Sequence, residues 1–550
     1  MIPPGSRPHA PDPASVNGKA PPIGEVTDLL VIGAGPAGVS AALAAAGRGV
    51  RVTLVDENPV PLSTMGGEVP LHFGGRMGAA VANRNAMLEA VLEANPQLAE
   101  AVDGGIDVRL GTAAWGLFPR RPTTNWIGGH VVGLADADRV YLLGFKQVIV
   151  ASGRRDMGLA FEGWERPGVM GASAAYRLAK TYGALDAHTA VLLGGGTEAL
   201  QVADALSEQG VRIAAIIEHA ETIGGPAKLL ARLTGKGARV LTRHVIEQAT
   251  GDSRGVTAVR VAAVDERGRR TGQAPEIIEC DTVLLAVGAV AAIELLEAGG
   301  CAVGFQLERG GHVPLLDGSQ RTSLPYVYAA GDCAGIWPTK TLCEAVACRE
   351  GALAARAALE ALGVRGEGAP EVAPVPDCPA RDIAHERLAW VRAALLHAPG
   401  DPWVCQCEEV TCADILSLRP PRYLGWPQAP GARDLRGLAA LEELTPHPDA
   451  VKRLTRAGMG LCQGRRCREQ IAALLALAGD HPLADVSLAT YRPPVRPLRL
   501  DQLAGLPESP AMADHWDSWF GMPTQWVPFW HVPPSYTVAT RSTVEPEAGE

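Results

Sequence analysis

Four cysteines in the C-terminal part of the chain lie in two closely spaced pairs. Cys405 and Cys407 form a C-x-C pair, and Cys462 and Cys467 form a C-x4-C pair. Four thiolates that converge from two short loops can hold a [2Fe–2S] cluster or a tetrahedral zinc ion. Because C-x-C is a less usual spacing for zinc than C-x2–4-C, the pattern favours an iron–sulfur centre and leaves a structural zinc as the alternative.

Each cysteine pair is expected to lie directly before a helix. Thr411 can cap a helix over residues 411–418, and residues 468–477 form a second helical stretch. The N-terminus of a helix presents backbone N–H groups, which stabilise negative charge on nearby sulfur atoms. We therefore expect two helices to position the four thiolates.

The N-terminal part contains a glycine-rich turn between a strand and a helix. Strand 28–32 runs into Gly-Ala-Gly-Pro-Ala-Gly, an Ala-rich helix follows over residues 39–47, and a second strand at 50–55 ends in two acids. The glycines permit close approach of a pyrophosphate, the helix N-terminus stabilises its charge, and the acid accepts hydrogen bonds from ribose hydroxyls. The pattern predicts a dinucleotide site formed by Gly33, Gly35, Pro36, Ala37, Gly38, Asp56 and Glu57.

Two later motifs indicate which dinucleotide binds there. A strand at residues 146–151 is followed by Gly153, and the run Thr-Ser-Leu-Pro-Tyr-Val-Tyr-Ala-Ala ends in Gly331 and Asp332. These motifs resemble those of the two-dinucleotide-domain, glutathione-reductase-like flavoproteins. The resemblance implies that FAD rather than NAD occupies the first site. It also implies that Asp332 contacts the ribityl or pyrophosphate part of FAD and that Gly153 passes close to its nucleotide half.

The segment that follows the second strand, residues 57–80, contains no cysteine. Disulfide reductases of the same class carry a redox-active cysteine pair next to the flavin, so disulfide chemistry is disfavoured here. His72 and Arg76 lie in this segment and could reach the flavin, although a structural role is the more usual one for such a histidine.

A second glycine-rich turn lies between the two later motifs. Strand 189–193 leads into Gly194 and Gly196, and the strand after the next helix ends in Glu218. This pattern predicts a site for NAD or another adenine nucleotide, and an acid at the strand end argues against NADP. The alternative is a vestigial fold retained for packing, because Glu198 would direct a carboxylate at the phosphate position unless it turns outward.

The composition is that of a globular protein without a nucleic-acid or membrane partner. Of the 550 residues, 47% are hydrophobic and 20% are charged, and the net charge is -10 without a basic stripe. No apolar run reaches the roughly 18–20 residues of a transmembrane segment, and the Pro-rich start lacks the apolar region of a secretory signal. We expect a cytoplasmic protein whose cysteines serve metal or redox chemistry rather than disulfides.

The glycine-rich turns together with the cysteine motifs resemble one family closely. The sequences C-Q-C-E-E-V-T and T-R-A-G-M-G-L-C-Q-G-R-R-C are similar to those of the large (alpha) flavoprotein component of heteromeric amine and amino-acid dehydrogenases. This family includes opine oxidase, hydrogen cyanide synthase, D-hydroxyproline dehydrogenase and heterotetrameric sarcosine oxidase. The cysteine region also resembles bacterioferritin-associated ferredoxin (BFD), although the second pair in that ferredoxin is C-x2-C.

The resemblance implies an FAD-dependent subunit that passes electrons through a [2Fe–2S] cluster. A beta subunit of the sarcosine/glycine-oxidase type, with its own flavin, would oxidise the C–N bond of a small amine or amino acid. FMN often lies at the subunit interface in this family. The sequence of this chain indicates no catalytic residue. Two other functions stay open: a self-contained NAD(P)H:acceptor reductase that uses the second turn, and a non-enzymatic scaffold with a structural zinc.

These observations predict an α/β fold of the two-dinucleotide-domain, glutathione-reductase-like type with a small, mainly α, BFD-like [2Fe–2S] domain. A proline-rich strap follows at residues 492–498, and a Trp-rich stretch near the C-terminus is expected to pack on a partner or on the chain itself. The predicted divisions are a disordered N-terminus (1–24), an FAD-binding domain (25–155 and 281–362), an inserted NAD(P)-binding-like domain (156–280), a linker (363–400), the BFD-like domain (401–485) and a Pro/Trp-rich tail (486–550).

Overall fold

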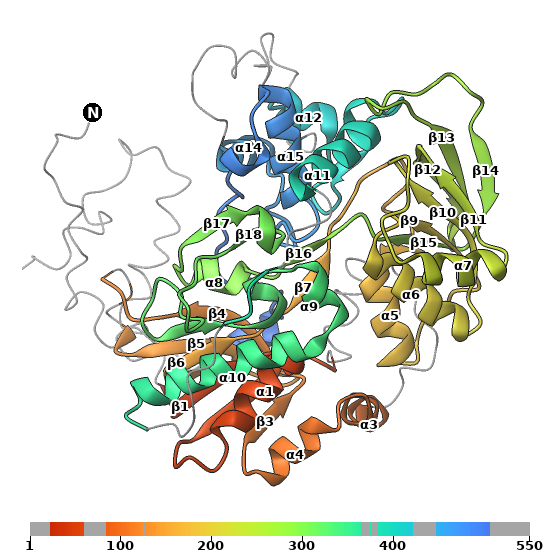
Figure 1. The fold of residues 1–550 in the computed structure, drawn as a ribbon. Helices are drawn as coiled ribbons and strands as arrows, with labels where there is room; N and C mark the ends of the chain where they lie inside the picture. Colours follow the sequence, from red (N-terminus) through yellow and green to blue (C-terminus); the bar gives the residue numbers. More distant parts are fainter. Residues whose placement is uncertain are drawn as a thin grey trace, which may run out of the picture.

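A computed structural model describes residues 23–59, 84–122, 124, 127–364, 373–376, 382–421 and 447–505. Most of the predicted N-terminal lead-in, the segment with His72 and Arg76, and the Trp-rich stretch lie outside these ranges. The described residues form the predicted α/β fold, in which the first domain has a mixed sheet, the second contains a parallel sheet and a third is mainly helical (Figure 1).

The first domain is built on one sheet and the helices that cover it. Its elements are β1 (Glu25–Ile32), α1 (Pro36–Ala45), β2 (Val52–Asp56), α3 (Arg84–Ala94), α4 (Gln97–Asp103), β3 (Asp107–Leu110), β4 (Ala113–Phe118), β5 (His130–Ala135), β6 (Val140–Val150), β19 (Val327–Ala329), α9 (Pro338–Leu342) and α10 (Glu344–Ala361). The sheet order is β3-β2-β1-β6-β5-β4, and β19 pairs with β6. Because β1 pairs in parallel with β2 and β6, the glycine-rich turn after β1 lies at the carboxyl edge of the sheet, where ligands bind in such folds.

The second domain is inserted into the first and contains a parallel sheet of order β11-β10-β9-β15-β8 beside an antiparallel sheet of order β12-β13-β14. Its elements are β8 (Val169–Gly171), α5 (Ala172–Lys180), β9 (Thr189–Leu193), α6 (Thr197–Glu208), β10 (Arg212–Glu218), α7 (Ala227–Gly235), β11 (Arg239–Thr242), β12 (His244–Asp252), β13 (Gly255–Ala263), β14 (Glu276–Glu279) and β15 (Thr282–Leu285). Since β15 pairs with β9, this domain extends past the boundary predicted at residue 280. A buried parallel strand has the same apolar pattern in either sheet, so the sequence could not show which sheet contains it.

Short elements link the two domains, and the cysteine domain follows them. The linking elements are β7 (Arg154–Asp156), β16 (Ala289–Ala291), α8 (Glu294–Ala298), β17 (Val303–Gln306), η3 (Leu307–Arg309) and β18 (Gly311–Pro314), while η4 (Gly331–Ala334) lies between β19 and α9 of the first domain. The cysteine domain and the residues after it contain α11 (Ile383–Val391), a π-helical turn η5 (Arg392–Leu396), β20 (Trp403–Cys405), β21 (Val410–Thr411), α12 (Cys412–Leu416), α14 (Pro448–Thr455), α15 (Arg468–Gly479), η7 (Leu483–Asp485) and α16 (Leu500–Ala504).

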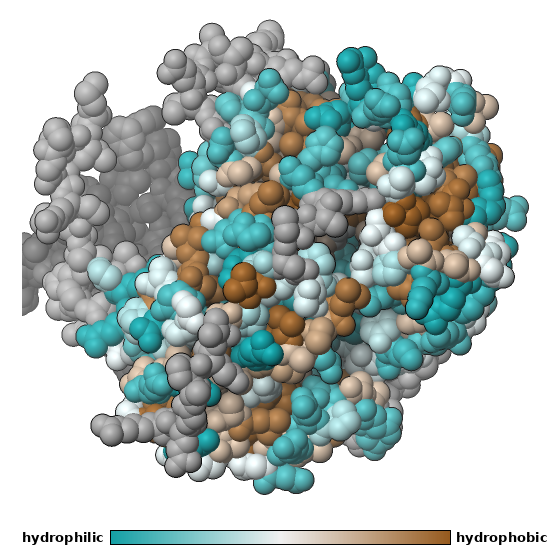
Figure 2. Space-filling model, in the orientation of Figure 1, coloured by the Kyte–Doolittle hydropathy of each residue, from teal (hydrophilic) through white to brown (hydrophobic). Residues whose placement is uncertain are grey.

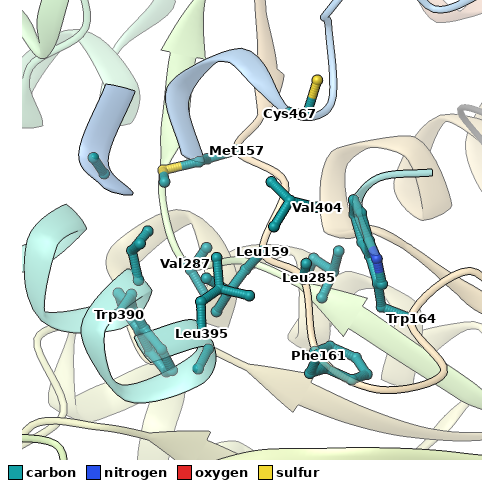
Figure 3. Packing of buried hydrophobic residues seen from close by; sticks show 14 of the residues in the cluster. Met157, Leu159, Phe161, Trp164, Leu285, Val287, Trp390, Leu395, Val404 and Cys467 are labelled. Carbon is teal, nitrogen blue, oxygen red and sulfur yellow. The ribbon is translucent and has the colours of Figure 1, made fainter. Parts of the chain in front are cut away.

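The cysteine domain shares a hydrophobic core with the second domain. Val404 and Cys467 belong to the same buried cluster as Met157, Leu159 and Trp164, and these side chains lie together in Figure 3. The indole Nε1 of Trp164 also donates a hydrogen bond to the carbonyl oxygen of residue 403, at 2.6 Å. The cysteine domain is therefore packed directly against the second domain.

The surface of the molecule carries both hydrophobic and hydrophilic side chains. On the face drawn in Figure 2, hydrophobic side chains form separate patches between hydrophilic ones, with one such patch over the strands of the second domain. Among the described residues, none of the helices has both the length and the apolar content needed to span a bilayer.

His312 on β18 makes the stability of the fold sensitive to acid. Its ring nitrogen Nε2 contacts the carbonyl oxygen of Val486 at 3.1 Å, and burial, together with the charge of Arg387, lowers the pKa of His312 to about 4. In the unfolded chain, His312 takes up a proton near pH 6.5, whereas in the folded chain it does so only near pH 4. The free energy of unfolding therefore falls as the pH decreases from about 6.5 towards 4.

We therefore expect His312 to account for up to about 3 kcal/mol of the stability that the protein loses over this pH range. Urea unfolding midpoints at pH 7.5 and pH 5 measure the loss. The variant His312→Gln should show a smaller decrease between the two pH values than the wild-type protein, and an equal decrease would contradict the assignment.

Candidate functional site

The first glycine-rich turn connects β1 to α1, and two of its glycines allow the backbone to pack tightly there. Gly33 has φ +108°, and an added Cβ there would lie 2.2 Å from the carbonyl oxygen of Ala151. An added Cβ at Gly38 would lie 1.8 Å from the carbonyl oxygen of Gly33. Helix α1 begins at Pro36, directly after Gly35. The turn and the N-terminus of α1 thus form a cradle that fits a pyrophosphate.

The two acids at the end of β2 have different partners. Asp56 accepts hydrogen bonds from the backbone N–H groups of Ala34, at 2.6 Å, and of Asn58, at 2.7 Å. The Asp56 carboxylate therefore holds the glycine-rich turn in place. It lies at the position where the sequence predicts a contact to a ribose. Glu57 instead forms an ion pair with Arg496, which follows the cysteine domain.

A buried ion pair holds the turn that contains Gly331 and Asp332. Lys340 Nζ donates hydrogen bonds to the carbonyl oxygens of Gly331, at 2.7 Å, and of Gly335, at 2.8 Å. Glu350 accepts from the N–H of Gly331 at 2.8 Å. Lys340 and Glu350 lie 2.7 Å apart with 0% of either side chain exposed. Burial lowers the pKa of Lys340 and raises that of Glu350, and the attraction between the two groups opposes both shifts.

Two cavities meet at the first glycine-rich turn. Gly35 and Gly153 line both of them. The volumes are about 530 Å³ and about 400 Å³. Predicted FAD residues that line the first cavity are Gly33, Asp56 and Glu57, and those that line the second are Pro36, Ala37, Gly331 and Asp332. Residues that are far apart in the sequence therefore lie together at this turn. A dinucleotide that crosses the turn would need this arrangement in order to bind.

The second glycine-rich turn has the same construction as the first. Gly194 has φ +112°, and α6 begins directly after Gly196. Glu218, with 3% exposure, accepts a hydrogen bond from the N–H of Gly195 at 2.9 Å. An added Cβ at Gly195 would lie 2.7 Å from Ile223, so that side chain packs onto the turn. Binding of NAD or another nucleotide at this turn stays a prediction.

Glu198 turns away from the second turn and faces the first domain. Its carboxylate pairs with Arg154 at 2.8 Å and accepts a hydrogen bond from the hydroxyl of Ser173 at 3.1 Å. Arg154 also pairs with Asp332 at 3.4 Å. Because the Glu198 carboxylate points away from the second turn, it would repel a phosphate there less strongly. Arg154 also connects the two nucleotide folds.

The four predicted cysteine ligands come together at one place. The sulfur of Cys407 lies 4.0 Å from that of Cys405 and 3.7 Å from that of Cys462. Cys467 lies close enough to Cys405 to affect the pKa of its thiol, and the Cys405 sulfur accepts a hydrogen bond from the backbone N–H of Gly458 at 3.3 Å. Three of the four residues have 1–2% exposure, and Cys407 is partly exposed.

The expected helices flank these cysteines. Thr411 caps α12 with a capping box, and α15 begins directly after Cys467. The hydrogen bond with Cys407 and burial raise the pKa of the Cys462 thiol well above its ordinary value. Four thiolates in this space would repel one another unless a cationic centre compensated them.

The donor set fits a thiolate-bound cluster by its chemistry. Within the described ranges, no group of three or more His, Cys, Asp or Glu side chains surrounds a point where a metal ion could bind. Two of the sulfur–sulfur distances, Cys405–Cys407 and Cys407–Cys462, are 4.0 Å and 3.7 Å. Four cysteines are nevertheless the ligand set that a [2Fe–2S] cluster takes.

Arg155 joins the first domain to the cysteine domain. It pairs with Glu294 and, at 2.8 Å, with Glu469 of α15. It also donates hydrogen bonds to the hydroxyl of Tyr491, at 3.2 Å, and to the carbonyl oxygen of Arg465, at 3.0 Å. Arg465 belongs to the C-x4-C loop and lines the first cavity. No sequence motif signals this network, because its members are brought together only by the tertiary fold.

Comparisons with known proteins agree with this geometry. The family described as pyridine nucleotide-disulphide oxidoreductase matches residues 27–358, and the sarcosine oxidase A3 domain matches residues 439–506. The A-type subunit of opine oxidase from Agrobacterium tumefaciens is 29% identical over 88% of this chain and 93% of its own length. The HcnB subunit of hydrogen cyanide synthase from Pseudomonas aeruginosa is 27% identical over 85% and 96%. The alpha subunit of sarcosine oxidase from a Corynebacterium species is 26% identical over 87% of this chain and 45% of its own length.

A solved structure shows the same fold. L-proline dehydrogenase from P. horikoshii aligns with a TM-score of 0.56 and 19% identity over 87% of this chain and 79% of that chain. The predicted fold class and the predicted resemblance to the large subunits are thereby confirmed. The chain belongs to the pyridine nucleotide-disulphide oxidoreductase family and is an FAD-dependent oxidoreductase related to the large subunits of opine oxidase, sarcosine oxidase and hydrogen cyanide synthase.

Proposed function

We propose that this chain is the electron-transferring subunit of a heteromeric amine or amino-acid dehydrogenase. Cys405, Cys407, Cys462 and Cys467 would hold a [2Fe–2S] cluster, and the first glycine-rich turn would hold FAD. A second flavoprotein of the sarcosine/glycine-oxidase type would bind the small amine or amino acid, with FMN at the interface between the subunits. The main support is the contact among the four cysteine sulfurs in a domain that packs directly on the dinucleotide folds.

The residues of this chain would bind and separate the two redox groups. A flavin accepts two electrons and a [2Fe–2S] cluster carries one, which allows a two-electron donor to serve a one-electron acceptor. Lys340 and Glu350 hold the turn with Asp332 in place for the flavin. The N–H of Gly458 stabilises charge on the Cys405 sulfur. The buried core around Val404 excludes water between the cysteines and the second domain.

Metal and sulfide analysis of the full chain, purified without oxygen, tests the cysteine assignment. We expect about two iron atoms and about two labile sulfides per chain, with visible absorption beyond the flavin bands. Zinc in place of iron would refute the cluster and favour a scaffold. Co-purification with the product of a neighbouring gene for a sarcosine/glycine-oxidase-type flavoprotein tests the heteromeric assembly.

A self-contained NAD(P)H:acceptor reductase is the second candidate function. The intact second turn, with Glu218 bonded to Gly195, is the observation that favours it. Anaerobic mixing of the purified chain with NADH separates the two functions. Rapid bleaching of the flavin would support the reductase and refute the electron-transferring role proposed above, whereas a stable flavin spectrum would exclude NADH as the donor.

Gly460 offers a test of the cysteine geometry that leaves all four ligands intact. An added Cβ at Gly460 would lie 2.6 Å from the sulfur of Cys407 and 3.0 Å from Glu408. We expect Gly460→Ala to displace Cys407 and to weaken metal retention about 10–100-fold, measured as the rate of iron release to a chelator. Gly318→Ala is the matched control, because nothing lies within 4 Å of its added Cβ. Equal release rates in both variants would contradict the proposed geometry.

A further inference from the structure

The proline-rich strap, residues 492–498, returns from the cysteine domain to the first domain. Val495 N–H donates a hydrogen bond to the carbonyl oxygen of Trp115 at 2.8 Å. Trp115 lies on β4, the edge strand of the sheet. Val495 itself has 4% exposure and belongs to the buried cluster that contains Val55 of β2 and Leu117 of β4. The strap is therefore packed into the nucleotide domain rather than lying loosely on its surface.

The strap also forms part of the wall of the first cavity. Val495 and Arg496 line the same space as Gly33, Asp56 and Glu57. Arg496 pairs with Glu57, and the two side chains have only 21% and 30% exposure. Without Arg496, the Glu57 carboxylate would carry an uncompensated negative charge beside a site that binds a dianionic pyrophosphate, which would repel the ligand.

Both ends of the strap are anchored by polar contacts. Before it, the carbonyl oxygen of Thr490 accepts a hydrogen bond from Lys452 of α14 at 2.9 Å, and the Thr490 hydroxyl donates one to Asp449 at 2.7 Å. After it, the Gln502 side chain on α16 donates a hydrogen bond to the carbonyl oxygen of Asp136 at 2.6 Å. A segment that is already fixed at both ends loses little further entropy when a ligand binds beside it, so it can help to retain the ligand.

We propose that the strap retains the adenine half of FAD and that Arg496 is its positioning residue. The ligand class is a dinucleotide whose ribose reaches Asp56 and whose pyrophosphate lies at the glycine-rich turn. Arg496 neutralises Glu57 and fixes it against the cavity wall, while Val495 closes the apolar side. The inference rests on FAD at the first turn and does not depend on the metal bound by the cysteines.

Flavin release from the full chain tests the strap. Release is followed by the rise in flavin fluorescence after dilution and by the flavin retained on ultrafiltration. We expect Arg496→Ala to release FAD about three to ten times faster than the wild-type protein. Arg499→Ala is the matched control, because Arg499 pairs with Asp501 on the exposed surface beyond the strap; its release rate should equal that of the wild-type protein.

A charge exchange separates a positioning role from general damage to the fold. Arg496→Glu alone should release FAD faster than Arg496→Ala, and Glu57→Arg combined with Arg496→Glu should recover most of the retention. Equal retention by the wild-type and Arg496→Ala proteins would overturn the strap proposal. Failure of the exchange to recover retention would also overturn the role of the pair. A wild-type chain that binds no FAD would instead refute FAD binding itself.

Discussion

Under the proposed function, replacement of Cys462 by serine is expected to remove iron and sulfide from the protein while FAD stays bound. Cys462 has 2% exposure, and its sulfur lies 3.7 Å from that of Cys407. A hydroxyl is a much weaker ligand for iron than a thiolate, so the variant should lose the absorption beyond the flavin bands. The first glycine-rich turn keeps its own contacts to Asp56, so flavin binding has no direct dependence on Cys462.

The ratio of iron to flavin in the purified chain measures this effect. Cys412→Ser is the control, since Cys412 is also buried but belongs to α12 and not to the four predicted ligands; this variant should keep its iron. Full iron content in the Cys462→Ser protein would show that the ligand assignment is wrong. Loss of both iron and FAD would show that the two sites depend on each other through Arg155 and Arg465.

Replacement of Lys340 by methionine is expected to destabilise the folded protein by about 3–5 kcal/mol. The variant would leave Glu350 buried without its cation, and the carbonyl oxygens of Gly331 and Gly335 would lose a donor. A charge in a fully buried position costs far more when it has no partner than when it is paired. The turn with Asp332 should move as well, so we expect weaker flavin binding in addition to lower stability.

Urea unfolding of the flavin-bound chain, followed by circular dichroism, measures the loss of stability. Lys146→Met is the matched control, because Lys146 pairs with Asp28 at 2.7 Å but 61% of its side chain is exposed; we expect a change of about 0–1 kcal/mol. The double variant Lys340→Met, Glu350→Leu should recover part of the stability, since it removes both buried charges. A Lys340→Met protein as stable as the wild type would show that the pair is dispensable.

The sequence predicted the parts of the site that depend on local spacing. Strand, glycine-rich turn and acid follow one another within a single structural unit, so Gly33 and Asp56 could be identified without the fold. The same holds for Thr411, whose side chain and that of Asp414 form a local capping box. The four cysteines were also predicted as a set, because two short motifs carry all of them.

The sequence could not predict contacts that depend on how distant segments pack. Lys340 and Glu350 lie on different helices, and neither residue is part of a recognisable motif. Arg155 meets Glu469 only after the cysteine domain docks on the first domain. The sequence shows the strap as a proline-rich stretch, but tertiary packing sets its direction. The ion pair between Arg496 and Glu57 therefore cannot be predicted from the sequence.

The core shared by the cysteine domain and the second domain would limit the motion of the proposed electron carrier. Met157, Trp164 and Val404 are almost completely buried, so the cysteine domain cannot swing away without exposing apolar surface to water. Many carriers rely on a mobile domain that searches for its partner by diffusion. Under the proposed function, the cysteine site would keep a fixed position on the second domain, so solvent viscosity should have little influence on electron transfer within the chain.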